Sequence, residues 1–197
     1  MTNALVVIDV QESFRQRAIW SATSNPDLIA NLNRLVDEFR RAGDAVVWVL
    51  HDEPGSGGVF DPALGHVRFI DGLRPPAPGE PVLHKTAHNA FTTTNLQQWL
   101  TERGIRALTV TGIRTEQCVE TTARIGSDLG YDVTFVTDAT ATFPIPHPDA
   151  ADRSVEEILA DPRTLSNADI LERTERVLAG RFATIRSVED LAPLPVG

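Results

Sequence analysis

The chain has 197 residues, of which 42% are hydrophobic and 23% are charged, as is ordinary for a globular protein. Its net charge of −9, from 27 acidic and 18 basic residues, disfavours binding to phosphate backbones and anionic membranes. No apolar run approaches the ~20 residues that a bilayer requires, and the N-terminal residues lack a signal-peptide pattern. We therefore expect one cytoplasmic domain over residues 1–197, with neither nucleic acid nor membrane as a partner.

Along the chain, short apolar runs alternate with amphipathic segments. Strands are predicted at 4–9, 45–50, 81–85, 106–112 and 132–139, and the continuous apolar runs at 4–9 and 45–50 suit strands buried on both faces. Helices are predicted at 25–43, 93–104, 115–130, 152–160 and 167–179. The first helix is expected to be capped by Asn25 and to end at Gly43. This alternation predicts an α/β fold in which a mostly parallel sheet is covered by helices on both faces.

Polar side chains stand where several of the predicted strands end. Asp9 ends the first strand, His51 and Asp52 follow the second, Lys85 ends the third, and Cys118 follows the fourth. Ligands of open parallel sheets bind beyond the carboxyl ends of the strands. These groups are therefore expected at one rim, where a binding site would lie.

Cys118 is the single cysteine of the chain, so it has no internal disulfide partner. A lone cysteine in a cytosolic helix is usually a small buried apolar residue. Its position within about one turn of a predicted helix start favours a different role, because the helix dipole there would lower the pKa of the thiol. Both interpretations, a nucleophile and an inert core residue, stay open on this feature alone.

A nucleophilic thiol needs a proton acceptor and a group that stabilises its charge. None of the five histidines has an obvious spacing for a Cys–His pair, so Asp9 and Lys85 are the stronger candidates. If the two meet, each offsets the other's desolvation, and a nearby thiol is beside both a base and a cation. The alternatives are a structural ion pair or two unrelated surface charges.

Three motifs in order give the chain a resemblance to the isochorismatase-like cysteine hydrolases. They are Asp-x-Gln-x-x-Phe at 9–14, a lysine at 85 ahead of the Ala-Phe pair at 90–91, and Gly-x-x-Thr-x-x-Cys-Val at 112–119. The resemblance covers most of residues 4–139 and, more weakly, the tail. It implies a three-layer α/β/α sandwich with a mostly parallel, Rossmann-like central sheet.

The resemblance also implies roles for individual residues. The family's Asp–Lys–Cys catalytic triad falls on Asp9, Lys85 and Cys118. A non-proline cis peptide is expected between Ile113 and Arg114, and an oxyanion hole from the N–H groups of Arg114 and Cys118. The implied activity is hydrolysis of an amide or related C–N bond in a small molecule, through a thioester and without a cofactor.

Further expectations concern the pocket and the assembly. Gln11 and Phe14 match family positions beside the pocket, and Phe60 lies in the 52–81 loop, which is long enough to act as a lid over the substrate. Ordinary core packing is an equally good interpretation of both aromatics. Family members are commonly dimers or tetramers, so a homo-oligomer is expected.

No metal is predicted. The metal-binding Asp-x-His of related nicotinamidases is absent, and the irregular spacing of His51, Asp52, Asp61 and His66 suits solvated loop residues better than a metal site. Two alternative functions remain: an isochorismatase-type vinyl-ether hydrolase, and a non-catalytic module that binds a small metabolite and carries a reactive thiol.

Overall fold

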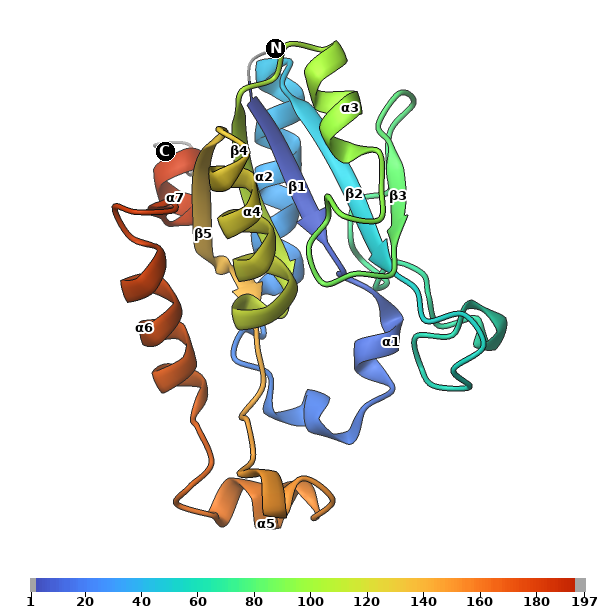
Figure 1. Cartoon of the computed structure of the whole chain (residues 1–197), viewed down its shortest axis with the longest axis vertical. Helices are drawn as coiled ribbons and strands as arrows, with labels where there is room; N and C mark the ends of the chain where they lie inside the picture. The colour runs from blue at the N-terminus through green and yellow to red at the C-terminus, as the bar shows by residue number, and fades with distance from the viewer. Residues whose placement is uncertain (1–2, 194–197) are drawn as a thin grey trace.

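A computed structural model describes residues 3–193 and shows a central sheet between two layers of helices (Figure 1). All neighbouring strands run parallel, in the order β3-β2-β1-β4-β5-β6. The strands are β1 Asn3–Ile8, β2 Ala45–His51, β3 Val82–Lys85, β4 Ala107–Ile113, β5 Asp132–Ala141 and β6 Thr184–Arg186. The predicted α/β/α sandwich is confirmed, and β6 includes two residues of the apolar run near 182–185.

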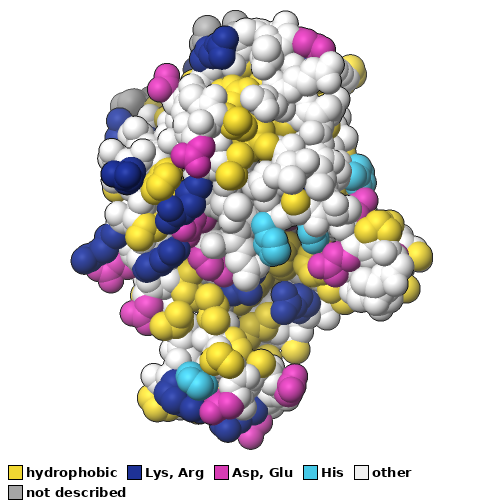
Figure 2. Space-filling model, in the orientation of Figure 1, with side chains coloured by type: hydrophobic (Ala, Val, Ile, Leu, Met, Phe, Trp, Pro, Cys, Tyr) yellow, Lys and Arg dark blue, Asp and Glu magenta, His cyan; other side chains and the backbone are white. Residues whose placement is uncertain are grey.

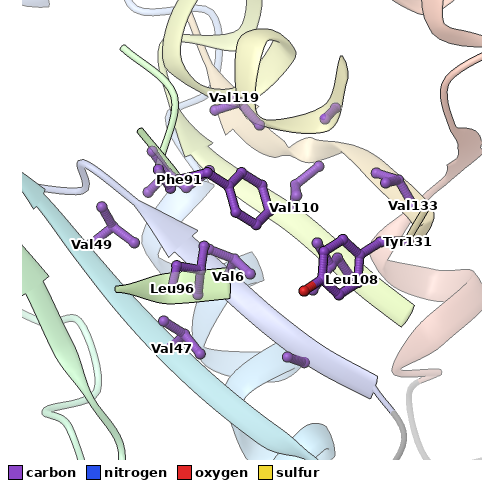
Figure 3. Packing of buried hydrophobic residues seen from close by; sticks show 14 of the residues in the cluster. Val6, Val47, Val49, Phe91, Leu96, Leu108, Val110, Val119, Tyr131 and Val133 are labelled. Atoms are coloured by element: carbon purple, nitrogen blue, oxygen red, sulfur yellow. The ribbon is translucent and has the colours of Figure 1, made fainter. Parts of the chain in front are cut away.

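The helices that cover the sheet are α2 Leu28–Ala42, α3 Leu96–Glu102, α4 Glu120–Asp128, α6 Asn167–Leu178 and α7 Val188–Leu191. Alternation along β1 divides the core in two, as expected for a strand buried on both faces. Val6 and Ile8 belong to the cluster under α3, α4 and α6, whereas Leu5 and Val7 belong to the cluster under α2 and α7. Figure 3 shows part of the first cluster, in which Val6 and Val110 of neighbouring strands lie near Phe91 and Val119.

The first long helix begins three residues later than its predicted start. Asn25 does not cap it: the Asn25 amide donates to the carbonyls of Asp138 and Thr140, and its oxygen accepts from the Asp27 N–H. Asp27 holds the N-cap position instead. The end was predicted correctly, since Gly43 adopts the left-handed conformation that commonly ends a helix.

The predicted helix over 115–130 is two elements. Thr115–Val119 forms a π-helical turn, in which the Val119 N–H reaches back to the carbonyl of Arg114 at 3.2 Å, and α4 starts only at Glu120. Cys118 therefore lies in the wider turn ahead of the α-helix and not in its first turn. Such turns are rare in proteins, and those that occur are often found at functional sites.

Several short elements carried no clear sequence signal. They are α1 Glu12–Arg15, the 3₁₀ turns Ala18–Ala22, Pro62–Leu64 and Pro148–Ala150, and α7. The segment that includes α5 Val155–Ala160 projects away from the sheet at the bottom of Figure 1, and a β-bridge between Ile145 and Leu165 closes its base. Within residues 3–193, no helix is long and apolar enough to cross a membrane.

Candidate active site

The carboxyl ends of β1, β3 and β4 bring three polar side chains together. Asp9 directly follows β1, Lys85 is the last residue of β3, and Cys118 lies in the turn after β4. Because the strands are parallel, these ends share one edge of the sheet. We call this group the Asp9–Lys85–Cys118 cluster.

The backbone at Asp9 turns sharply out of β1. Its φ of 54° is in the left-handed region, which is uncommon for a residue other than glycine and better tolerated by Asp than by most residues. The turn is fixed by two hydrogen bonds, from the Asp9 N–H to the Val49 carbonyl and from the Gln11 N–H to the Asp9 carbonyl, both at 2.9 Å. The chain conformation thus sets the direction of the carboxylate.

Two backbone features lie at the end of β4, ahead of the cysteine. Gly112 has a φ of 119°, and a Cβ built on it would lie 1.9 Å from the carbonyl oxygen of Ile8, so only glycine fits there. The peptide bond between Ile113 and Arg114 is cis, as the resemblance implied. The close approach at Gly112 holds the ends of β1 and β4 against each other.

Lys85 is the centre of the cluster. Its Nζ lies 2.7 Å from Asp9 Oδ2, as an ion pair whose geometry departs from that of a well-directed hydrogen bond. The same Nζ donates to Cys118 Sγ at 3.4 Å. The side chains of Asp9 and Lys85 have no solvent exposure, and Cys118 is 7% exposed. A buried charge of either sign needs such a partner.

A fourth residue contacts the cluster, one that the sequence placed at the same rim without a role there. His51, the last residue of β2, places its Nδ1 3.2 Å from Lys85 Nζ. The sequence signal was that His51 and Lys85 both stand at the ends of predicted strands; the structure adds that the two are register partners in the sheet. Residues paired in this way on neighbouring strands have side chains on the same face.

The predicted lowering of the cysteine pKa is wrong. Burial and the charge of Asp9 raise the pKa of the Cys118 thiol to about 12, although Lys85 opposes them. The helix-start argument failed because the sulfur is buried beside an anion. Burial also raises the pKa of Asp9, against the lowering effect of Lys85. The resting cysteine is therefore a neutral thiol beside a carboxylate with increased proton affinity.

Of the predicted pocket residues, Phe14 and Phe60 pack edge to face, with ring centroids 5.0 Å apart. The ring of Phe60 also packs against the ring of His51, with centroids 5.7 Å apart, which places this loop aromatic beside the cluster. Gln11 is fully buried, and its amide is engaged with the backbone of His51: it accepts from the N–H at 2.8 Å and donates to the carbonyl at 3.0 Å. The Gln11 amide thus holds the end of β2 in place.

Arg114 and Glu116 form a second charged pair near the cysteine. Arg114 Nε lies 3.0 Å from Glu116 Oε1, with the two side chains 11% and 10% exposed. The Arg114 guanidinium also donates to the Phe143 carbonyl, and Glu116 accepts from the Thr142 hydroxyl. These contacts connect the π-helical turn to the segment that leaves β5.

Two cavities differ in their relation to the cluster. One of about 490 Å³ is lined by Glu116, two residues before the cysteine, and by side chains of the projecting segment and α6, including Leu165. Hydrophobic side chains gather in this region between the body and the lower projection in Figure 2. The other, of about 570 Å³, is lined by residues such as Asp138 and Arg186, and neither cavity is lined by Asp9, Lys85 or Cys118.

The residues considered as alternative metal ligands do not converge. His84 Nδ1, not His51, lies 3.0 Å from Asp52, and the carboxylate of Asp61 accepts the backbone N–H groups of Gly57 and Ala63. Over residues 3–193 there is no group of three or more His, Cys, Asp or Glu side chains placed to hold a metal ion.

The chain belongs to the isochorismatase family: the family model of the isochorismatase domain matches residues 3–166. It is 28% identical to the isochorismatase family protein YrdC of Bacillus subtilis, over 95% of this chain and 93% of that protein. It is 32% identical to streptothricin hydrolase of Streptomyces noursei, over 98% of this chain and 67% of that enzyme. An isochorismatase from Pseudomonas putida has a similar structure, with a TM-score of 0.77 and 31% identity over 96% of this chain and 89% of that one. The resemblance seen in the sequence motifs is thereby confirmed.

Proposed function

We propose that residues 1–197 form one hydrolase domain that cleaves an amide or related C–N bond of a small molecule through a thioester on Cys118. The observation that carries the proposal is the contact of one buried ammonium, Lys85, with both the Asp9 carboxylate and the Cys118 sulfur. A nucleophile and a base that contact the same cation are the groups that covalent hydrolysis requires.

In the first half-reaction, Asp9 accepts the thiol proton while Cys118 Sγ bonds to the carbonyl carbon. Lys85 stabilises the negative charge, which at this stage moves from the carboxylate to the substrate oxygen. The tetrahedral intermediate then collapses, the C–N bond breaks, and Asp9 returns its proton to the departing nitrogen. The products of this stage are ammonia or an amine and a thioester.

In the second half-reaction, water attacks the thioester carbon and gives its proton to Asp9. The C–S bond then breaks, and the sulfur regains a proton from Asp9 as the carboxylic acid leaves. The raised pKa of Asp9 supports this role, because a base works best when its pKa approaches the working pH. The high pKa of the thiol supports proton transfer during attack and not a stable resting thiolate.

The environment supplies the remaining elements of the proposal. The backbone N–H groups of Arg114 and Cys118 are assigned to the oxyanion hole, where they would donate to the substrate oxygen, as the family resemblance implies. Phe14 and Phe60 are assigned to the wall of the substrate site, because Phe60 contacts His51 and His51 contacts Lys85. Gln11 supports the site through the backbone of His51. No cofactor is assigned to any step.

A screen for ammonia release over primary amides, carbamoyl compounds and ureides tests the proposal, with Cys118→Ala as the inactive control. For a substrate found in this way, mass spectrometry after rapid acid quenching should detect the acyl group on the peptide that contains residue 118. Turnover that survives in Cys118→Ala would refute covalent catalysis. Turnover of a vinyl ether, without ammonia and without an acylated cysteine, would favour the alternative isochorismatase-type reaction.

A further inference from the structure

We infer that His51 is a positioning residue of the candidate site, which orients the Lys85 ammonium between Asp9 and Cys118. This inference rests on the proposed function and adds a fourth residue to it. It starts from the 3.2 Å contact between His51 Nδ1 and Lys85 Nζ.

The Lys85 ammonium is buried, so its hydrogen-bonding capacity has to be met by protein groups. A protonated lysine has three N–H donors and no acceptor. Within the part of the chain that the structure describes, Nζ has three close polar neighbours: Asp9 Oδ2 at 2.7 Å, His51 Nδ1 at 3.2 Å and Cys118 Sγ at 3.4 Å. Lys85 has no solvent exposure, so water is not available to replace a lost neighbour. The imidazole therefore accepts the third N–H of the Lys85 ammonium.

The contact with the ammonium fixes the tautomer of the His51 imidazole. Because the ammonium can only donate, His51 Nδ1 must accept, and the ring is then neutral with its hydrogen on Nε2. Nε2 lies 3.4 Å from Glu53 Oε1, a carboxylate oxygen that can accept that hydrogen. The neighbours of both ring nitrogens thus fit the tautomer in which Nδ1 accepts and Nε2 carries the hydrogen.

His51 is itself held in place by its neighbours. The Gln11 side chain binds both its N–H and its carbonyl, and the Phe60 ring packs against the imidazole edge to face. Its register pairing with Lys85 sets the two side chains on the same face of the sheet. A group fixed in this way can determine the direction of a flexible lysine side chain.

Without the imidazole, one N–H of a buried ammonium has no acceptor. The ammonium then turns away from the sulfur toward another acceptor, and it stabilises the developing thiolate less. A hydrogen bond to a charged group is strong enough that its loss should slow attack by the sulfur by about ten- to hundredfold.

The test compares His51→Asn with His51→Leu. The Asn oxygen lies at nearly the position of Nδ1 and can accept from Lys85, whereas Leu fills a similar volume without an acceptor. The first readout is the rate of Cys118 alkylation by iodoacetamide at fixed pH, followed by mass spectrometry, which needs no substrate. The second is kcat and KM for any amide that the screen identifies. The control is His84→Asn, an exposed histidine that pairs with Asp52. Thermal unfolding of each variant reports whether it is folded.

Alkylation and kcat should fall about ten- to hundredfold in His51→Leu, with KM little changed. In His51→Asn they should return to within a few-fold of the wild-type values, and His84→Asn should match the wild type. Equal rates in wild type and folded His51→Leu would overturn the inference, as would an equal loss in both His51 variants. If alkylation slows as expected but no acyl-cysteine ever forms, the positioning role stands and the proposed hydrolysis fails.

Discussion

Lys85 Nζ lies 2.7 Å from Asp9 Oδ2, and neither side chain has any exposure to solvent. A buried pair of this kind contributes little net stability as a pair, because both charges have been taken out of water. Removal of one partner is costly, however, because the other charge is left buried and uncompensated.

Asp9→Asn and Lys85→Met should therefore each lower the free energy of unfolding by about 3–5 kcal/mol. The double variant should lose several kcal/mol less than the sum of the single losses, because it leaves no unpaired charge. Urea unfolding at pH 7 measures this coupling. The exposed pair Arg74–Asp37 is the control, and its double-mutant cycle should give a much smaller coupling, because water screens both charges. Additive losses at Asp9 and Lys85 would contradict the buried pairing.

Gly112→Ala should destabilise the protein by more than about 4 kcal/mol or prevent folding, since its new methyl group would overlap the Ile8 carbonyl. Gly104 provides a matched comparison, with a φ of 64° and no atom within 4 Å of the place that a methyl group would occupy. Gly104→Ala should cost only about 1 kcal/mol, from backbone conformation alone. Thermal and urea unfolding distinguish the two, and similar losses would argue against the close approach of β1 and β4.

The raised pKa of Cys118 predicts a loss of stability at high pH. Above pH 9 the unfolded chain releases the thiol proton, whereas the folded protein keeps it up to about pH 12. The folded state then binds more protons than the unfolded state, so the free energy of unfolding falls as the pH rises through this window.

Between pH 8 and pH 10 this one group should account for a loss of about 1 kcal/mol. Cys118→Ala lacks the group and should lose that much less over the same interval, as measured by urea unfolding. If both proteins lost stability equally, the thiol would not be the buried, neutral group that the structure indicates.

Treatment with a chelator should leave hydrolysis unchanged. The structural reason is that His51 Nδ1 faces the Lys85 ammonium, and a metal ion at that nitrogen would be placed against another cation. The measurement is ammonia release before and after dialysis against EDTA, with zinc added back to a third sample. A loss that zinc restores would contradict the prediction that the loop beyond β2 holds no metal.

The fold was largely predictable from the sequence because its strands are apolar runs bounded by turn residues. The same patterns could not locate the start of α2, since the Asn25 amide binds the carbonyls of Asp138 and Thr140, which lie more than a hundred residues away. Elements as short as α1 and α7 have too few residues for a helical period to show.

At the candidate site, residue types and strand ends selected Asp9, Lys85 and Cys118, but not their surroundings. The thiol pKa was predicted in the wrong direction because the burial of Cys118 and its distance from Asp9 depend on tertiary packing. His51 was noted at the same rim, yet its contact with Lys85 depends on the register of β2 against β3. No local pattern in the sequence sets that register.

The members of the cluster come from strands that are far apart in the chain, and β2 lies between the two that carry Asp9 and Lys85. Carboxylate, ammonium and sulfur can meet only after β1, β2, β3 and β4 have all associated. The centre thus depends on long-range pairings, each of which closes a long loop at a cost in chain entropy. A fragment that ends before β4 would retain two of the three groups and none of the proposed chemistry.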